Sequence, residues 1–168
     1  AAAITPRTRV LLLNTPHNPT GVVFTPDELA RVAELACSRG LLVISDEVYE
    51  HMVFDGTHLP IASLPGMAGR TVTISSAAKT FSFTGWKVGW VTGSPEIVTA
   101  VRTVKQFLTY VSSGPFQYAI ARALALPDSY YASVADGLRP KRDFFCDGLA
   151  AVGFEVYRPA GTFFVTTD

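Results

Sequence analysis

Four short runs of apolar residues, each followed by polar or small residues, constrain the fold of this chain most strongly. The runs span residues 9–13, 41–44, 71–74 and 88–91. Runs of four or five residues are typical of buried strands and are too short for helices. Apolar strands that alternate with a helix are the pattern of a parallel sheet covered on both faces. We therefore expect an α/β fold that binds its ligand beyond the carboxyl ends of the strands.

The residues between the first two runs carry start and stop signals for a helix. Thr25 is able to accept a hydrogen bond from the backbone of Glu28, whose carboxylate reaches back, and Pro26 stands at the first helical position. Gly40 provides the end of the helix. An apolar stripe at helical spacing lies between these signals and is formed by Leu29, Val32, Ala33, Leu35 and Ala36.

The second half of the chain has a different pattern, with long segments at helical spacing. We expect helices over residues 95–109, 115–126 and 129–152. Residues 154–157 and 162–165 are expected to form the two arms of a hairpin. The change in pattern suggests that a second, smaller domain begins near residue 130.

Charge and composition exclude several classes of protein. Lys plus Arg and Asp plus Glu both number 14, and this balance argues against a nucleic-acid partner. Only 17% of the residues are charged, below the ~25% of an ordinary soluble domain. A covered sheet or a large partner surface would explain this value. The uncharged run over residues 106–121 is interrupted by Ser, Gly and Pro and is too short to predict a membrane span.

The cysteines and histidines give no metal-site pattern. Cys37 and Cys146 are too few for a disulfide framework, and we expect free thiols in a reducing cytoplasm. His17, His51 and His58 lack the spacing of metal ligands on a helix, so no metal is expected.

Lys79 is the first residue with candidate chemistry. It follows an apolar strand and the small residues 75–78, which we expect to form a loop. A partly desolvated lysine loses some preference for its charged form and becomes a nucleophile toward an aldehyde. The alternative from position alone is a solvated surface lysine.

Asp46 is the second candidate, because it ends the buried run 41–44. A carboxylate there is able to pair with a protonated pyridine nitrogen, an interaction of roughly 1.5–3 kcal/mol. The alternative is an N-cap for a helix that starts at Glu47. In one helical turn, the phenol of Tyr49 would face the same side as Asp46.

Three segments in order, residues 14–21, 45–49 and 76–90, resemble the class I/II aminotransferases of pyridoxal phosphate (PLP) fold type I. The chain is most similar to the kynurenine/methionine aminotransferase-like branch and resembles the central part of such an enzyme. The resemblance implies a mostly parallel sheet flanked by helices and the start of a small α+β C-terminal domain. The implied division is 1–128 for part of the large PLP-binding domain, 129–152 for an interdomain helix and 153–168 for the small domain.

The resemblance also implies roles for individual residues. Lys79 would bind the cofactor covalently and then carry a proton between the substrate Cα and the cofactor. Asp46 would pair with the pyridine nitrogen, and both Asn18 and Tyr49 would hydrogen-bond the ring 3-oxygen.

The cofactor phosphate would be held by Ser76 and Lys87, where lysine keeps the charge of the arginine found in many relatives but loses its bidentate geometry. Family members are more than twice this length, and the arginine that binds the substrate carboxylate lies downstream of Asp168; Arg158 does not match it. The resemblance thus implies a cytoplasmic homodimer that transaminates an amino acid and a 2-oxo acid, and a fragment that is inactive alone. Phe107, Tyr110 and Phe116 are expected to line a helix interface near the dimer partner.

Other readings of the same residues remain open. A β-lyase acting on C–S bonds or a cyclase-like synthase uses the same lysine, aspartate and tyrosine, and some transcription regulators carry an aminotransferase-like domain that senses PLP. Ser76 and Lys79 also match the Ser-x-x-Lys pattern of penicillin-binding enzymes, but the companion Ser-Asp-Asn and Lys-Thr-Gly motifs are absent from the sequence. No Gly-x-Gly-x-x-Gly follows a strand, which argues against a dinucleotide-binding domain.

Overall fold

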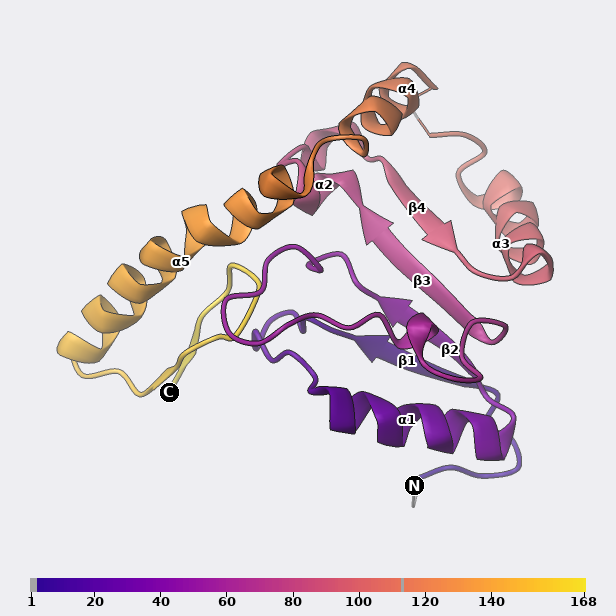
Figure 1. Cartoon of the computed structure of the whole chain (residues 1–168), viewed down its shortest axis with the longest axis horizontal. Coiled ribbons are helices and arrows are strands. Elements are labelled where there is room, and N and C mark those ends of the chain that lie inside the picture. Colours follow the sequence, from indigo (N-terminus) through magenta and orange to yellow (C-terminus); the bar gives the residue numbers. More distant parts are fainter. Residues whose placement is uncertain (1–2, 113) are drawn as a thin grey trace.

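A four-stranded sheet forms the centre of the computed structural model, which describes residues 3–112 and 114–168 (Figure 1). Its strands lie in the order β1-β2-β3-β4. They are β1 (Val10–Asn14), β2 (Leu42–Asp46), β3 (Thr71–Ser76) and β4 (Gly89–Thr92). The four predicted strands are therefore confirmed, each ending one or two residues later than expected. The fold is a mostly parallel sheet flanked by helices, as the sequence indicated.

The sheet is parallel from β1 to β3, whereas β4 runs antiparallel to β3. The β3–β4 connection holds only α2 (Ala77–Thr80) and a single 3-10 turn (Thr84–Trp86). A parallel return needs a longer crossover, usually a full helix across the face of the sheet. The short connection therefore turns β4 back along its neighbour.

Helix α1 (Pro26–Arg39) has the caps that the sequence indicated. The Thr25 hydroxyl accepts from the Glu28 N–H, the Glu28 carboxylate accepts from the Thr25 N–H, and Gly40 ends the helix at φ 62°. The buried face of α1 packs on one side of the sheet and on the 3-10 turn Ile61–Ser63. This core contains Leu13, Leu29, Ala33, Ala36, Leu41, Val43, Ile61 and Met67.

The predicted helices of the second half are also present. They are α3 (Pro95–Leu108), α4 (Gly114–Ala123) and α5 (Asp128–Ala151). A second core joins α2, β4 and α4 around Ala77, Phe81, Val88 and Ile120. Phe116 packs there on Trp86, whereas Phe107 and Tyr110 are 83% and 76% exposed and are not covered by any other described residue, so their place in an interface with a dimer partner stays a prediction. No described helix combines the length and the apolar character needed to cross a bilayer.

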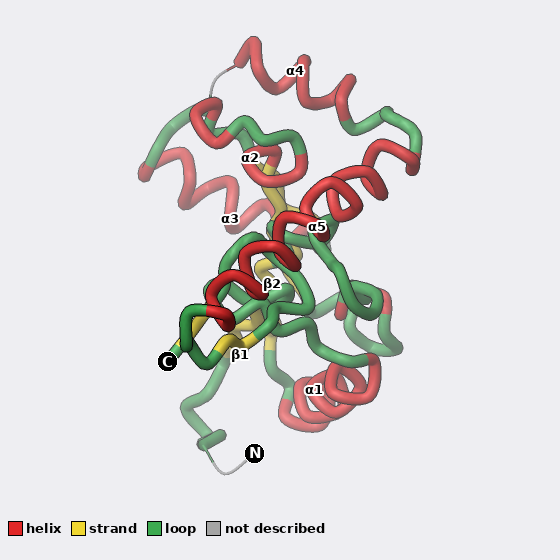
Figure 2. The backbone as a smooth tube through the Cα atoms, turned by 90° about the vertical axis from the view of Figure 1, so that its left-hand side faces the viewer, coloured by secondary structure: helices red, strands yellow, loops and turns green. Residues whose placement is uncertain are grey.

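The predicted C-terminal hairpin is only half correct. Strand β5 (Val156–Tyr157) pairs with β6 (Thr166–Thr167), so the second arm predicted at 162–165 is wrong. Residues 158–165 form a loop instead, because their backbone bonds to the first half of the chain. The Gly161 N–H donates to the Gly21 carbonyl (2.9 Å), and the Thr162 N–H donates to the Met52 carbonyl (2.8 Å). This C-terminal loop lies near the carboxyl ends of the parallel strands (Figures 1 and 2).

Candidate active site

The carboxyl ends of β1 and β2 are tied together by Asn14, the last residue of β1. Asn14 stands opposite Asp46 in the parallel register, and its side-chain amide donates to the Asp46 carbonyl (3.0 Å). The Asn14 side-chain oxygen accepts from the Asn18 N–H (2.9 Å). One asparagine thus holds the loop of Asn18 against the end of β2. The sequence motif included Asn14, but no role was predicted for it.

Asp46 ends β2 and is half-buried. Its carboxylate accepts from the Val48 N–H at 3.4 Å, and no ion pair among the described residues involves Asp46. No helix starts at Glu47, because residues 48–51 form turns, so the N-cap reading of Asp46 is wrong. The site therefore presents a carboxylate that is able to accept a cation.

Tyr49 is brought to Asp46 and Asn18 by these turns rather than by the helical turn expected from the sequence. Its side chain is only 2% exposed. Burial raises the pKa of the Tyr49 phenol, the nearby Asp46 carboxylate raises it further, and a hydrogen bond with Asn18 opposes both effects. The phenol therefore keeps its proton at neutral pH and remains a hydrogen-bond donor.

The aromatic wall beside Tyr49 was not predicted. Phe163 and Phe164 of the C-terminal loop meet the Tyr49 ring edge to face, with ring centroids 5.4 Å and 6.0 Å away. The sequence pattern predicts a hairpin strand for both residues and does not indicate that they reach this edge of the sheet.

Lys79 lies on the same side, on a short helix. The predicted loop 75–78 is wrong, because Ser75 and Ser76 end β3 and residues 77–80 form α2. The Ser76 hydroxyl caps α2 by accepting from the Ala78 N–H (3.1 Å). Lys79 is half-buried, and its Nζ lies 5.8 Å from the Tyr49 ring centroid and 5.9 Å from that of Phe163. The Lys79 side chain is thus partly buried beside two aromatic rings.

Ser76 and Lys87, the predicted phosphate-binding pair, lie at the end of β3 and just before β4. Ser76 stands opposite Gly89, and its hydroxyl donates to the Val88 carbonyl (3.4 Å). Lys87 is exposed and has a left-handed backbone at φ 53°. It lines a cavity of about 540 Å³ beside β4, whereas Lys79 lines a different cavity of about 390 Å³. Their shared role in phosphate binding stays a prediction.

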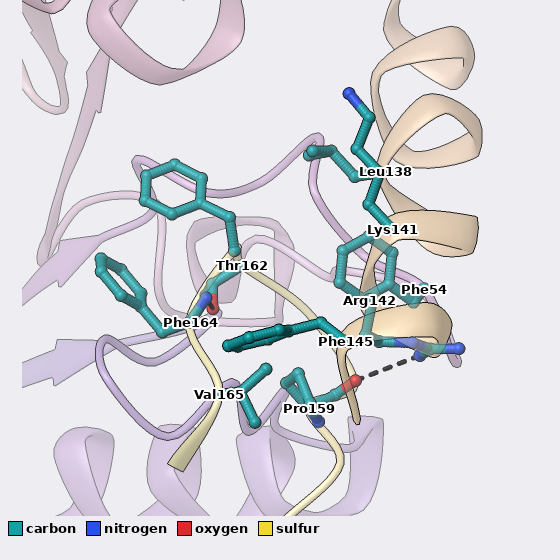
Figure 3. Close-up of a pocket in the computed structure, with 10 residues that line it drawn as sticks. Phe54, Leu138, Lys141, Arg142, Phe145, Pro159, Thr162, Phe164 and Val165 are labelled. Atoms are coloured by element: carbon teal, nitrogen blue, oxygen red, sulfur yellow. Dashed lines mark hydrogen bonds between the residues drawn. The ribbon is translucent and has the colours of Figure 1, made fainter. Parts of the chain in front are cut away.

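A further cavity of about 330 Å³ adjoins that of Lys79, and Figure 3 shows its lining side chains. The side chains come mainly from α5 and the C-terminal loop. Arg142 connects α5 to the C-terminal loop by donating to the Pro159 carbonyl (3.1 Å), and it also pairs with Asp55 (2.5 Å). Leu138, Lys141 and Phe163 line both cavities, so a second amine stands close to the Lys79 cavity.

A cluster of two acids and a histidine, of which Glu47 is buried and Glu50 and His58 are half-buried, lies behind the turns that carry Tyr49. The imidazole of His58 contacts the Glu47 carboxylate at 2.8 Å, and one ligand atom each from Glu47, Glu50 and His58 lie within 4.8 Å of one another. Serine hydroxyls also donate to both carboxylates. Helical spacing of the histidines could not reveal this cluster, because a loop brings His58 to Glu47.

Comparison with known proteins identifies a family that this chain matches. The sequence model of the family "Aminotransferase class I and II" matches residues 1–168. The chain is 52% identical to the probable N-succinyldiaminopimelate aminotransferase DapC of Mycobacterium tuberculosis over 167 residues, which cover 99% of this chain and 42% of the relative. It is 43% identical to the kynurenine–oxoglutarate transaminase of Dictyostelium discoideum, covering 100% and 40%.

Solved structures of aminotransferases have the same fold as this chain. The structure of N-succinyldiaminopimelate aminotransferase from M. tuberculosis superposes with a TM-score of 0.93 over 96% of this chain and 42% of that one, at 52% identity. A double mutant of Thermus thermophilus aspartate aminotransferase gives a TM-score of 0.92 at 34% identity, covering 99% and 44%. The chain therefore spans about two fifths of the length of these relatives.

The resemblance carried by the three sequence motifs is confirmed over the whole chain. Enzymes of this family depend on pyridoxal phosphate. The match to all 168 residues, together with the solved structures of the same fold, shows that the chain belongs to the class I and II aminotransferase family.

Proposed function

We propose that the natural protein containing this sequence is a PLP-dependent aminotransferase and that this chain supplies its cofactor-binding lysine. The observation that carries the proposal is the position of Lys79. Its Nζ lies 5.8 Å from the ring of Tyr49, at the edge of the sheet where Asp46 and Asn18 also meet Tyr49. A half-buried amine beside a buried phenol, with a carboxylate and an amide near the same phenol, is the set of groups that a pyridine aldehyde requires.

The residues offer a partner for each group of the cofactor, with Lys87 lining a different cavity from Lys79. Asp46 has no cationic partner among the described residues and so is able to pair with a protonated pyridine nitrogen. Tyr49 and Asn18 offer a phenol and an amide to the ring oxygen. Ser76 and Lys87 offer a hydroxyl and an ammonium group, which suit a phosphate dianion.

When bound, pyridoxal phosphate supplies an aldehyde that condenses with amines and a ring that accepts electrons from the substrate Cα. The remaining chemistry belongs to this chain. The Nζ of Lys79 takes the proton from the substrate Cα and holds it for return. Asp46 would hold a negative charge for the ring nitrogen, and Tyr49 would donate a hydrogen bond from its phenol. The rings of Tyr49 and Phe163 shield the Lys79 amine from water on one side.

We infer that the substrates are an amino acid and a 2-oxo acid. The relatives are named for N-succinyldiaminopimelate, kynurenine and aspartate. All three names describe transamination from an amino donor, and only this common reaction is carried over to the protein.

We also infer a homodimer in the cytoplasm. Large apolar side chains of α3 and α4 and of the segment between them are exposed, which supports a partner surface there; they include Phe107, Leu108, Tyr110 and Tyr118. The free cysteines support a reducing compartment. The sedimentation mass of the natural protein tests the dimer, and a monomer at micromolar concentration would contradict it.

The reaction type is tested by incubating the cofactor-loaded natural protein with a panel of amino donors and no acceptor. Transamination converts the cofactor to pyridoxamine phosphate, which chromatography detects, and a 2-oxo acid is released in equal amount. Release of ammonia and pyruvate from a cysteine conjugate, without pyridoxamine phosphate, would instead identify a C–S β-lyase. Binding of the cofactor with neither product would identify a sensor domain.

A further inference from the structure

Two carboxylates, those of the buried Glu47 and the half-buried Glu50, hold the turns that carry Tyr49. Glu47 is fully buried, and its carboxylate accepts from the Ser45 hydroxyl at 2.7 Å and meets the His58 Nε2 at 2.8 Å. The side chain of His58 is only 8% exposed, and its Nδ1 has no hydrogen-bond partner in the described part of the chain. Nothing in the proposed chemistry of Lys79 and Asp46 uses these groups.

The Glu47 side chain lies on the opposite side of the chain from Asp46. It bonds to Ser45, two residues before it, and side chains two apart in an extended segment share one face. The Glu47 N–H donates to the Ile74 carbonyl at 2.9 Å, which fastens the start of the turns to β3. Glu47 therefore fixes the backbone from behind, while Asp46 faces the site.

Glu50 fixes the other end of the same segment. The Ser75 hydroxyl of β3 donates to the Glu50 carboxylate at 2.5 Å, and the Glu50 N–H donates to the Glu47 carbonyl at 2.9 Å. Tyr49 lies between these two acids, and its carbonyl accepts from the Met52 N–H at 2.8 Å. Hydrogen bonds of Glu47 and Glu50 thus hold the turns on both sides of Tyr49. The contact between Glu47 and His58 is the buried part of this arrangement.

A carboxylate without exposure to water needs its hydrogen-bond partners. Removing one partner of a buried pair leaves the other unsatisfied, and the backbone moves to bring it to water. Ser45 lies on the strand, whereas His58 comes from a loop and bonds Glu47 through its ring; among the described residues the Glu50 carboxylate also lies within 4.8 Å of this pair. Loss of the His58 ring would therefore release the turns and the phenol that they carry.

We propose that Glu47 and His58 are positioning residues for Tyr49, and that their buried contact keeps the phenol beside the Lys79 amine. The inference rests on the proposed function only in giving Tyr49 a cofactor to act on. The placement of Tyr49 is a property of the protein alone and is measurable without cofactor.

The first measurement is the titration of Tyr49 in the full natural chain freed of cofactor. Tyrosine labelled with ¹³C at the ring Cζ reports each phenol by NMR, and the Tyr49→Phe variant identifies the signal. His58→Ala is expected to move the Tyr49 titration toward that of free tyrosine, because the phenol becomes exposed. His58→Gln, which keeps a donor near the Nε2 position, and Glu34→Gln on the exposed face of α1 are expected to leave it unchanged.

An unchanged Tyr49 titration in a folded His58→Ala protein would overturn the proposal. If His58→Ala does not fold, Ser45→Ala takes its place, since it removes the other hydrogen bond to Glu47 and is expected to shift the Tyr49 titration in the same direction. An unshifted titration in folded Ser45→Ala together with an unfolded His58→Ala would also overturn it, because the pair would then serve stability alone.

The second measurement uses the loaded enzyme. A misplaced Tyr49 is expected to lower kcat about tenfold in His58→Ala with KM within about threefold, and His58→Gln is expected to restore kcat. Equal losses in His58→Ala and His58→Gln would contradict a positioning role. If the natural protein fails to attach PLP to Lys79, the proposed function falls, and the tyrosine titration still decides the role of His58.

Discussion

The Nζ atom of Lys79 lies 5.8 Å from the centre of the Tyr49 ring, although the two residues are 30 positions apart in the sequence. The parallel pairing of β2 and β3 produces this contact, because Asp46 ends one strand beside the other and the next turns bring Tyr49 to α2. The strand ends thus convert two separate sequence motifs into one site.

Replacing Asp46 tests the electrostatic role of its carboxylate. Asp46→Ala is expected to retain the cofactor through Lys79 but to slow deprotonation of the substrate Cα by at least about 10²-fold, since a positioned charge is lost. Rapid-mixing kinetics with a substrate deuterated at Cα measure this step. Asp136→Ala, an exposed residue of α5, is the matched control. Equal rates in the Asp46→Ala and control variants would show that Asp46 does not act on the ring.

The pKa of Tyr49 predicts how stability changes with pH. Burial and Asp46 raise the pKa of its phenol in the folded chain, so the native state keeps this proton above pH 10 after the unfolded state has lost it. The stabilisation by Tyr49 is therefore present below the unfolded pKa of about 10 and is lost as pH rises through the higher folded pKa. Tyr49→Phe removes this dependence.

Urea unfolding at several pH values between 8 and 11 measures the effect. The free energy of unfolding is expected to fall more steeply above pH 10 in the native sequence than in Tyr49→Phe. Tyr131 and Tyr157 also have raised pKa values, the first mainly through burial and the second mainly through a hydrogen bond to Asp168, and both remain in the variant as an internal control. Parallel pH curves for the two proteins would contradict the burial of the Tyr49 phenol.

Substitutions at two glycines with similar left-handed backbones distinguish the cost of a steric clash from the cost of backbone strain. Gly21 (φ 68°) and Gly40 (φ 62°) are both left-handed, but a Cβ at Gly21 would lie 2.8 Å from the Gly161 carbonyl, while a Cβ at Gly40 meets no atom within 4 Å. Gly40→Ala is expected to cost about 1 kcal/mol of strain. Gly21→Ala is expected to cost more, because it also displaces the C-terminal loop that carries Phe163.

Fluorescence-monitored urea unfolding compares the two glycine variants, and the Tyr49 titration by NMR shows whether the C-terminal loop has moved. A larger loss of stability in Gly40→Ala than in Gly21→Ala would mean that the loop does not pack on Gly21.

Two leucines test the core beneath the sheet. Leu29 is 1% exposed on the buried face of α1, whereas Leu12 is 74% exposed on β1. Leu29→Ala is expected to lower the free energy of unfolding by about 2–5 kcal/mol, and Leu12→Ala by less than about 0.5 kcal/mol. The same urea experiment measures both. A similar cost at the two positions would indicate that another part of the natural protein covers Leu12.

Local sequence signals identified most of the fold. The strands, the capping box at Thr25 and the Gly40 cap depend on neighbouring residues, and the structure confirms them. The nearness of Asn18 to Asp46 followed from their places at strand ends, whereas Tyr49 was expected beside Asp46 through a helical turn, which the structure replaces by other turns. The sequence did not show that residues 158–165 leave the predicted hairpin, because the pairing of Thr162 with Met52 is a contact between distant backbone segments.

The sequence did not predict the aromatic wall, or the cluster of Glu47, Glu50 and His58, for the same reason. Phe163 reaches Tyr49, and His58 reaches Glu47, only after loops return to the sheet, and no spacing rule encodes such a return. The low charge of the chain indicated either a covered sheet or a partner surface. The exposure of Phe107 and Tyr110 favours the partner surface, since these side chains find no cover within the described residues.

The site at which the cofactor attaches tests the central claim most directly. The natural protein is loaded with PLP, reduced with borohydride, digested and analysed by mass spectrometry. The account predicts a pyridoxyl group on Lys79 and none on Lys141, although Lys141 lines the same cavity. Attachment to Lys141 or Lys105, or attachment that persists in Lys79→Ala, would contradict it.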